Sequence, residues 1–205
     1  MTDMSCLNGS PEPPCLTIPE SCDCQTMALR LQEKLCIVES QCSLKKMGRV
    51  LQTNKGILMH CSSLLGCTLC STRSHFMMLL TTICQRITSC LEKVLGILIR
   101  QYNRLHAQDD PQPFFGSFGD EDDENHQIMV SGYDLDIDEE PCIFGALTLV
   151  QLQKLRTLLD HIRDITIAQQ WKPHMDIINQ NIKEVVYQIS LYDKTRSTDT
   201  STPNL

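Results

Sequence analysis

The feature that most constrains the fold is an apolar stripe that recurs every three or four residues between positions 47 and 65. This period is that of one face of an α-helix, whereas the faces of a strand alternate at every second residue. Gly66 follows the stripe and favours a helix end there. Only Asn54 is polar among its members, which are Met47, Val50, Leu51, Asn54, Ile57, Leu58, Cys61, Leu64 and Leu65.

The same period predicts four more helices, while no stretch shows the alternation of a strand. They are expected at residues 23–44, at 74–106, from 143 or 147 to about 169, and from about 174 to 192. Asp23 and Ser74 are candidate N-caps, because their side chains can accept from free backbone amides. The expected apolar faces include Met27, Leu31, Leu35, Val38 and Cys42 in the first helix and Leu79, Ile83, Ile87, Leu91 and Leu95 in the second of these four.

We therefore predict an all-α protein, an irregular bundle of about five helices with an acidic disordered linker. Aromatic residues make up only 5% of the chain, which favours a core of Leu, Ile, Met and Cys. The helix from Ser74 is apolar around much of its circumference and is expected at the centre. The predicted parts are a disordered tail at 1–22, a helical domain at 23–106, the linker at 107–141, a helical pair packing on the first three helices at 142–192, and a second tail at 193–205.

The linker concentrates the negative charge of the chain. Between Asp109 and Glu140 there are twelve Asp and Glu and no Lys or Arg, so without them the net charge of −7 becomes +5. Composition favours a solvated linker. The alternative is an activation segment, in which the aromatic side chains among the acids bind a coactivator. The residues concerned are Phe114, Phe115 and Phe118.

The twelve cysteines raise the question of a metal site. Cys67 and Cys70 have the C-x2-C spacing of zinc ligands, and Cys22 with Cys24 forms a C-x-C. About forty residues separate the two pairs, so we expect packed thiols and no metal. Cysteines on apolar helical faces are also expected to be core thiols, namely Cys36, Cys61, Cys84 and Cys90.

The sequence also argues against several functional classes. It has no G-x-S-x-G, no glycine-rich phosphate loop and no H-E-x-x-H, so we expect no enzymatic activity. Its scattered Lys and Arg give direct DNA binding little support. The start of the chain does not resemble a secretory signal, and the longest uncharged apolar stretch, residues 75–85, is too short to span a membrane. We expect an intracellular, soluble chain without a membrane partner.

One region resembles a known family. CDCQTMALRLQEKL, from Cys22, and VLQTNKGILMHCSSLLGCTLCSTRSHFMMLLTTICQRI, from Val50, are similar to the C-terminal regulatory domain of the aflatoxin regulatory protein family. The resemblance covers some eighty residues, and it rests on the C-x-C before a helix, the C-S-x-L-L-x-C-x2-C run and the apolar helix that contains Cys84. It implies that the signature cysteines are structural: Cys22, Cys24, Cys61, Cys67 and Cys70.

The resemblance further implies a nuclear regulator of fungal secondary-metabolite genes, such as those for aflatoxin or sterigmatocystin-like polyketides. Members of the family bind DNA through a separate N-terminal binuclear zinc cluster of six cysteines. That cluster has no counterpart in this sequence, so its zinc-binding and DNA-contacting residues are not carried over. We expect no cofactor in this chain, and zinc only in such a cluster outside it.

Three functions follow as hypotheses. The first is the effector and interaction domain of a transcription regulator, with transcriptional co-regulators as partners and DNA reached only through another domain or partner. The second is a stand-alone helical adaptor that binds or competes with a full-length regulator, as a homo- or heterodimer. The third is a small metal-binding or redox protein that uses Cys67 and Cys70.

Overall fold

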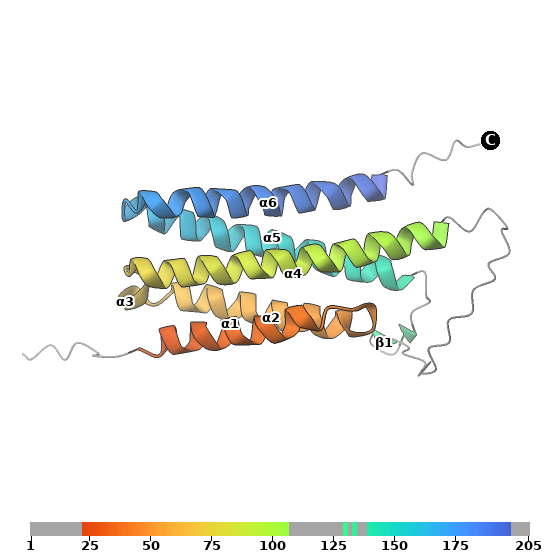
Figure 1. Ribbon diagram of the computed structural model, residues 1–205, viewed down its shortest axis with the longest axis horizontal. Helices are drawn as coiled ribbons and strands as arrows, with labels where there is room; N and C mark the ends of the chain where they lie inside the picture. Colours follow the sequence, from red (N-terminus) through yellow and green to blue (C-terminus); the bar gives the residue numbers. More distant parts are fainter. Residues whose placement is uncertain (1–21, 107–128, 131–132, 135–138, 198–205) are drawn as a thin grey trace, which may run out of the picture.

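The computed structural model describes residues 22–106, 129–130, 133–134 and 139–197. Its long helices lie side by side along one axis, which confirms the all-α fold (Figure 1). A 3-10 turn, Leu44–Lys46, joins the first two helices, and two two-residue strands, β1 (Met129–Val130) and β2 (Tyr133–Asp134), pair antiparallel. The α-helices are α1 (Cys24–Ser40), α2 (Met47–Leu65), α3 (Thr68–Ser71), α4 (Ser74–His106), α5 (Glu139–Ala168) and α6 (Lys172–Ser197).

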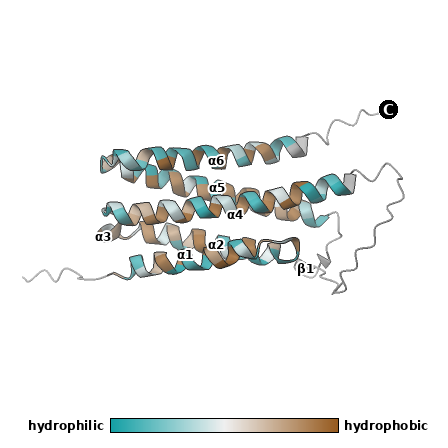
Figure 2. Cartoon of the chain, viewed as in Figure 1, coloured by the Kyte–Doolittle hydropathy of each residue, from teal (hydrophilic) through white to brown (hydrophobic). Residues whose placement is uncertain are grey.

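Helix α4 is the centre of the bundle, as its apolar circumference predicts. It contacts α1, α2, α5 and α6, and Figure 1 shows it between the α1–α2 pair and the α5–α6 pair. The outer helices α1 and α6 alternate between hydrophilic and hydrophobic residues along their length (Figure 2). The buried apolar residues of α4 are Phe76, Met77, Leu80, Ile83, Cys84, Ile87, Cys90, Leu91, Val94, Leu95 and Leu98.

The apolar stripe of α2 forms its buried face. All nine residues of the stripe are buried, including the polar Asn54. Gly66 ends the helix as predicted, with φ −69°, an ordinary helical value rather than the left-handed one. Helix α5 packs across α2, where the side-chain amide of Gln151 donates to the backbone carbonyl of Leu51 at 2.9 Å.

Several local predictions were wrong. Asp23 precedes α1, but its side chain makes no capping hydrogen bond, and its carbonyl accepts from the Met27 amide at 2.9 Å. Ser74 is the first residue of α4 rather than its cap, and its hydroxyl bonds to Nε2 of His174 at 2.8 Å. Leu31 and Leu35 of the predicted α1 face are buried, but Met27 is 37% exposed and its neighbour Ala28 is buried in its place.

Helix α5 begins earlier, and helix α6 ends later, than the sequence predicts. Helix α5 starts at Glu139 and not at residue 143 or 147, and Pro141 lies in its first turn. A proline is tolerated there because the first amides of a helix have no intrahelical partner. Helix α6 continues to Ser197, beyond the predicted end at 192. None of the described helices has both the length and the apolar composition needed to cross a membrane.

Gly145 of α5 lies close to the side chain of Tyr192 of α6. A Cβ added at this position would lie 2.5 Å from the hydroxyl oxygen of Tyr192 and 2.7 Å from its Cε2. By contrast, a Cβ at Gly56 on α2 would meet no atom within 4 Å. The two helical glycines therefore differ in how much space surrounds them.

We expect Gly145→Ala and Gly56→Ala to change stability in opposite directions. Alanine favours a helix over glycine by about 1 kcal/mol, so Gly56→Ala should stabilise the protein by up to that amount. At Gly145 the clash with Tyr192 should outweigh this gain and destabilise the protein by about 1–2 kcal/mol. Urea unfolding followed by circular dichroism measures both. Two shifts of the same sign would contradict the described packing of α5 on α6.

Candidate metal centre

Four cysteines meet at one end of the bundle. Cys22 precedes α1 and Cys24 is its first residue, whereas Cys67 precedes α3 and Cys70 lies within it. Their Sγ atoms all lie within 4.8 Å of one another, and the Sγ atoms of Cys22 and Cys70 are 2.9 Å apart. We refer to Cys22, Cys24, Cys67 and Cys70 as the four-thiol cluster.

The hairpin of α1 and α2 brings the two cysteine pairs together. The two helices contact each other and have similar lengths, 17 and 19 residues. Since the short 3-10 turn reverses the chain between them, the start of α1 and the end of α2 lie at the same end of the bundle (Figure 1). Helix α3 follows α2 directly and carries the second pair.

The backbone of the C-x2-C segment is arranged around the sulfur of Cys67. Cys67 is extended, with φ −78° and ψ 108°, and its carbonyl accepts from the amides of Cys70 at 3.2 Å and Ser71 at 2.9 Å. The backbone amide of Cys70, the thiol of Cys24 and the amide of Leu69 also act as hydrogen-bond donors to the Cys67 sulfur. The amide of Cys70 contributes most, and together these donors lower the pKa of Cys67 to about 7. A thiolate is the form of cysteine that binds metals.

The other thiols of the cluster are less acidic. Burial, reinforced by the thiols of Cys67 and Cys22, raises the pKa of Cys24 to about 11. Burial raises the pKa of Cys70 as well, and this side chain is only 3% exposed. Cys22, Cys24 and Cys67 are partly exposed, so the cluster adjoins solvent. In the part of the chain that the structure describes, no other group of His, Cys, Asp or Glu side chains gathers in this way.

Cys61, the fifth signature cysteine, does not belong to the cluster. It is fully buried in α2, and burial raises its pKa to about 12. Cys84 and Cys90 of α4 are also fully buried, as expected of packed thiols. The three aromatic residues of the suggested activation segment, Phe114, Phe115 and Phe118, lie outside the described residues.

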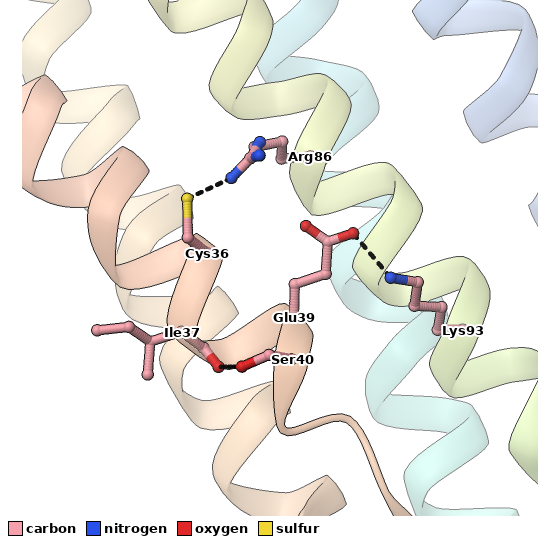
Figure 3. Close-up of polar contacts among 6 residues, drawn as sticks. All are labelled: Cys36, Ile37, Glu39, Ser40, Arg86 and Lys93. Atoms are coloured by element: carbon pink, nitrogen blue, oxygen red, sulfur yellow. Dashed lines mark hydrogen bonds and ion pairs between the residues drawn. The ribbon is translucent and has the colours of Figure 1, made fainter.

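The prediction that Cys36 is a core thiol was wrong. Cys36 is exposed on α1, and its sulfur accepts a hydrogen bond from Arg86 of α4. Figure 3 shows this contact beside a second one between the same helices, in which Lys93 Nζ lies 2.8 Å from a carboxylate oxygen of Glu39. Both contacts lie on the outer edge of the α1–α4 interface, well apart in sequence from the four-thiol cluster.

The sequence shows both cysteine pairs, but the separation of about forty residues between them argued against a shared metal site. The structure brings the two pairs together. One signal was available in the sequence. The first pair stands at the start of one predicted helix, and the second pair follows the end of the next helix, which is of nearly equal length. A hairpin of such helices places both pairs at the same end.

The region that contains the four-thiol cluster is similar to known proteins. The family model of the aflatoxin regulatory protein matches residues 20–111, a range that contains the four-thiol cluster and helices α1 to α4. One relative is the aspyridones cluster regulator of Neocamarosporium betae, 26% identical over 135 residues. That match covers 64% of this chain but only 30% of the relative. No solved structure matches the chain significantly. Over residues 20–111, somewhat less than half of its length, the chain is similar to the aflatoxin regulatory protein family.

Proposed function

We propose that the chain is the effector and interaction region of a nuclear regulator that controls transcription of a secondary-metabolite gene cluster. The observation that carries this proposal is the family match over residues 20–111. It is supported by the relative, whose printed name is that of a cluster regulator. The proposed region has no catalytic activity and reaches DNA through another domain or a partner protein.

The shape of the bundle suits a role in protein contacts. The five long helices of the described residues form an extended body, and all five contribute side chains to its core. Several large apolar side chains nevertheless remain on the surface, including Met59 of α2, which is 64% exposed, and Leu147 and Val150 of α5. We propose transcriptional co-regulators or a full-length regulator as the partners.

A tethered reporter assay tests the effector role. The full chain, fused to an unrelated DNA-binding domain in a filamentous fungus, is expected to raise transcription from a reporter that carries the matching operator. The DNA-binding domain alone is the control. A second fusion, with Phe114, Phe115 and Phe118 all replaced by alanine, separates the acidic segment from the bundle. Loss of activation in this variant assigns the activity to the acidic segment, and retention assigns it to the helices.

The same experiment distinguishes the adaptor from the effector. A fusion that leaves the reporter silent, together with co-purification of a DNA-binding regulator with the full chain, would favour the adaptor. A silent fusion without a co-purifying regulator would contradict both functions.

A further inference from the structure

We propose that the four-thiol cluster binds one Zn²⁺ as a closed tetrahedral site that holds α1 to the end of α2. The inference concerns the architecture of the bundle and does not depend on the proposed function. It rests on the geometry of the cluster, on the first turn of α1, in which no described residue is fully buried, and on the backbone donors around Cys67.

The size of the cluster fits a zinc ion. A tetrahedral site with Zn–S bonds of about 2.3 Å places its four sulfur atoms about 3.8 Å apart. In the structure the four Sγ atoms lie within 4.8 Å of one another, and the Cys22–Cys70 pair is at 2.9 Å. The required separation falls between these two values. Small rotations of the side chains would therefore complete the tetrahedron without moving the helices.

The chemistry of the ligands also points to zinc and to a structural role. Four cysteine sulfurs in tetrahedral reach are the ligand set of structural zinc, whereas catalytic zinc sites keep one position for water or substrate. No His, Asp or Glu of the described residues belongs to the cluster. On binding, each cysteine thiol loses its proton to solvent and forms one Zn–S bond, so no oxidant or reductant is needed.

The backbone around Cys67 provides the support that a ligating sulfur requires. The amides of Leu69 and Cys70 donate to the Cys67 sulfur. Such donors outside the ligand shell hold a metal ligand in orientation and offset its negative charge. By contrast, burial is the largest influence on the pKa of the core thiols Cys61 and Cys84, and it is the sole influence found for Cys61.

Helix α1 needs an anchor of this kind. Only three of its 17 residues are buried, Ala28, Leu31 and Leu35, whereas α2 buries nine of 19. None of the three lies in the first turn of α1, and Asp23 makes no side-chain cap. A metal bound by Cys22 and Cys24 would fix this end of the helix to α3. It would also close a loop of more than forty residues, which lowers the entropy of the unfolded chain.

Zinc content tests the proposal directly. The full chain, purified under reducing conditions without chelator, is expected to contain one zinc per chain by elemental mass spectrometry. The double variant Cys67→Ser/Cys70→Ser should contain none. The matched variant Cys36→Ser/Cys142→Ser changes two exposed cysteines outside the cluster and should keep one zinc.

Cobalt provides a readout that does not depend on whether the serine variant folds. The unaltered full chain, loaded with Co²⁺ in place of zinc, should show the intense absorption of a tetrahedral four-thiolate site, with thiolate-to-cobalt charge transfer. Added zinc should abolish this absorption. A folded, helical full chain that carries no metal and gives no such spectrum would overturn the proposal, as would iron in place of zinc. Disulfides among the four cysteines in that metal-free chain, detected by intact mass, would assign the cluster to a redox role instead.

Discussion

Replacing Ile87 with alanine is expected to lower the free energy of unfolding by about 3 kcal/mol. Ile87 is fully buried in α4, the helix that contacts both pairs of neighbouring helices. Removal of its side chain costs the transfer free energy of the lost carbons and leaves a cavity that the surrounding helices fill only in part. Urea unfolding, monitored by circular dichroism with zinc held constant, measures the change.

The matched control is Ile37→Ala on α1. Ile37 is 54% exposed and points away from α4, as Figure 3 shows, so its replacement should change stability by less than about 0.5 kcal/mol. The same chemical change thus separates a central position from a surface one. Equal effects at the two positions would be incompatible with α4 as the centre of the bundle.

Replacing Phe144 with alanine is expected to cost about 4 kcal/mol. Phe144 is only 5% exposed, and its ring packs on α2, with its Cε1 3.6 Å from the place a Cβ on Gly48 would occupy. Truncation of a buried phenylalanine removes more apolar surface than truncation of most other side chains. The same unfolding measurement applies.

Leu147→Ala is the control for Phe144→Ala, because it lies one turn away on α5 and is 47% exposed. It should cost less than about 1 kcal/mol. The pair also tests where α5 begins. A helix that started only after Phe144 would leave the aromatic ring outside the core, and Phe144→Ala would then be nearly neutral.

The helices themselves could be predicted because their signal is local. Every member of the α2 stripe is buried, and the extensive apolar surface of the segment from Ser74 correctly placed it at the centre. The period fixes a face only to within about one residue, since adjacent positions are about 100° apart around the helix. This is why Ala28 rather than Met27 is buried, and why Leu80 is buried more deeply than Leu79.

The start of α5 was missed for a different reason. Glu139, Glu140 and Pro141 look like the end of an acidic linker, yet acids and proline are also favoured in the first turn of a helix. What decides between the two is the burial of Pro141 and Phe144 against the rest of the bundle. Such burial depends on contacts with residues nearly one hundred positions away, and the period of a single segment does not contain it.

The four-thiol cluster could not be predicted from the sequence for the same reason, because it also depends on contacts between distant residues. Each pair had a spacing that metals accept, but a site needs four ligands, and the sequence does not state which pairs meet. The meeting of Cys24 and Cys67 follows from the antiparallel packing of α1 and α2 and from their nearly equal lengths. Pairs of cysteines at the outer ends of a helical hairpin are therefore worth considering as one site.

The proposed zinc site and the core have different roles in residues 20–111. The four-thiol cluster is proposed to hold the start of α1, while the buried stripe of α2 and the central α4 contribute to the core against which α5 and α6 pack. The outer surfaces of these helices then remain available for partners. This arrangement agrees with the proposed role in transcriptional control, in which contacts with other proteins take the place of catalysis.

The proposed control of a secondary-metabolite gene cluster by this chain is tested most directly in the source organism. The segment encoding residues 22–197 is deleted in frame, and transcripts are measured across the genome under conditions that induce secondary metabolism. Transcripts of the genes of one cluster are expected to fall to background and to recover when the intact segment is restored. Unchanged transcripts in every such cluster, with the deletion verified, would contradict the proposal.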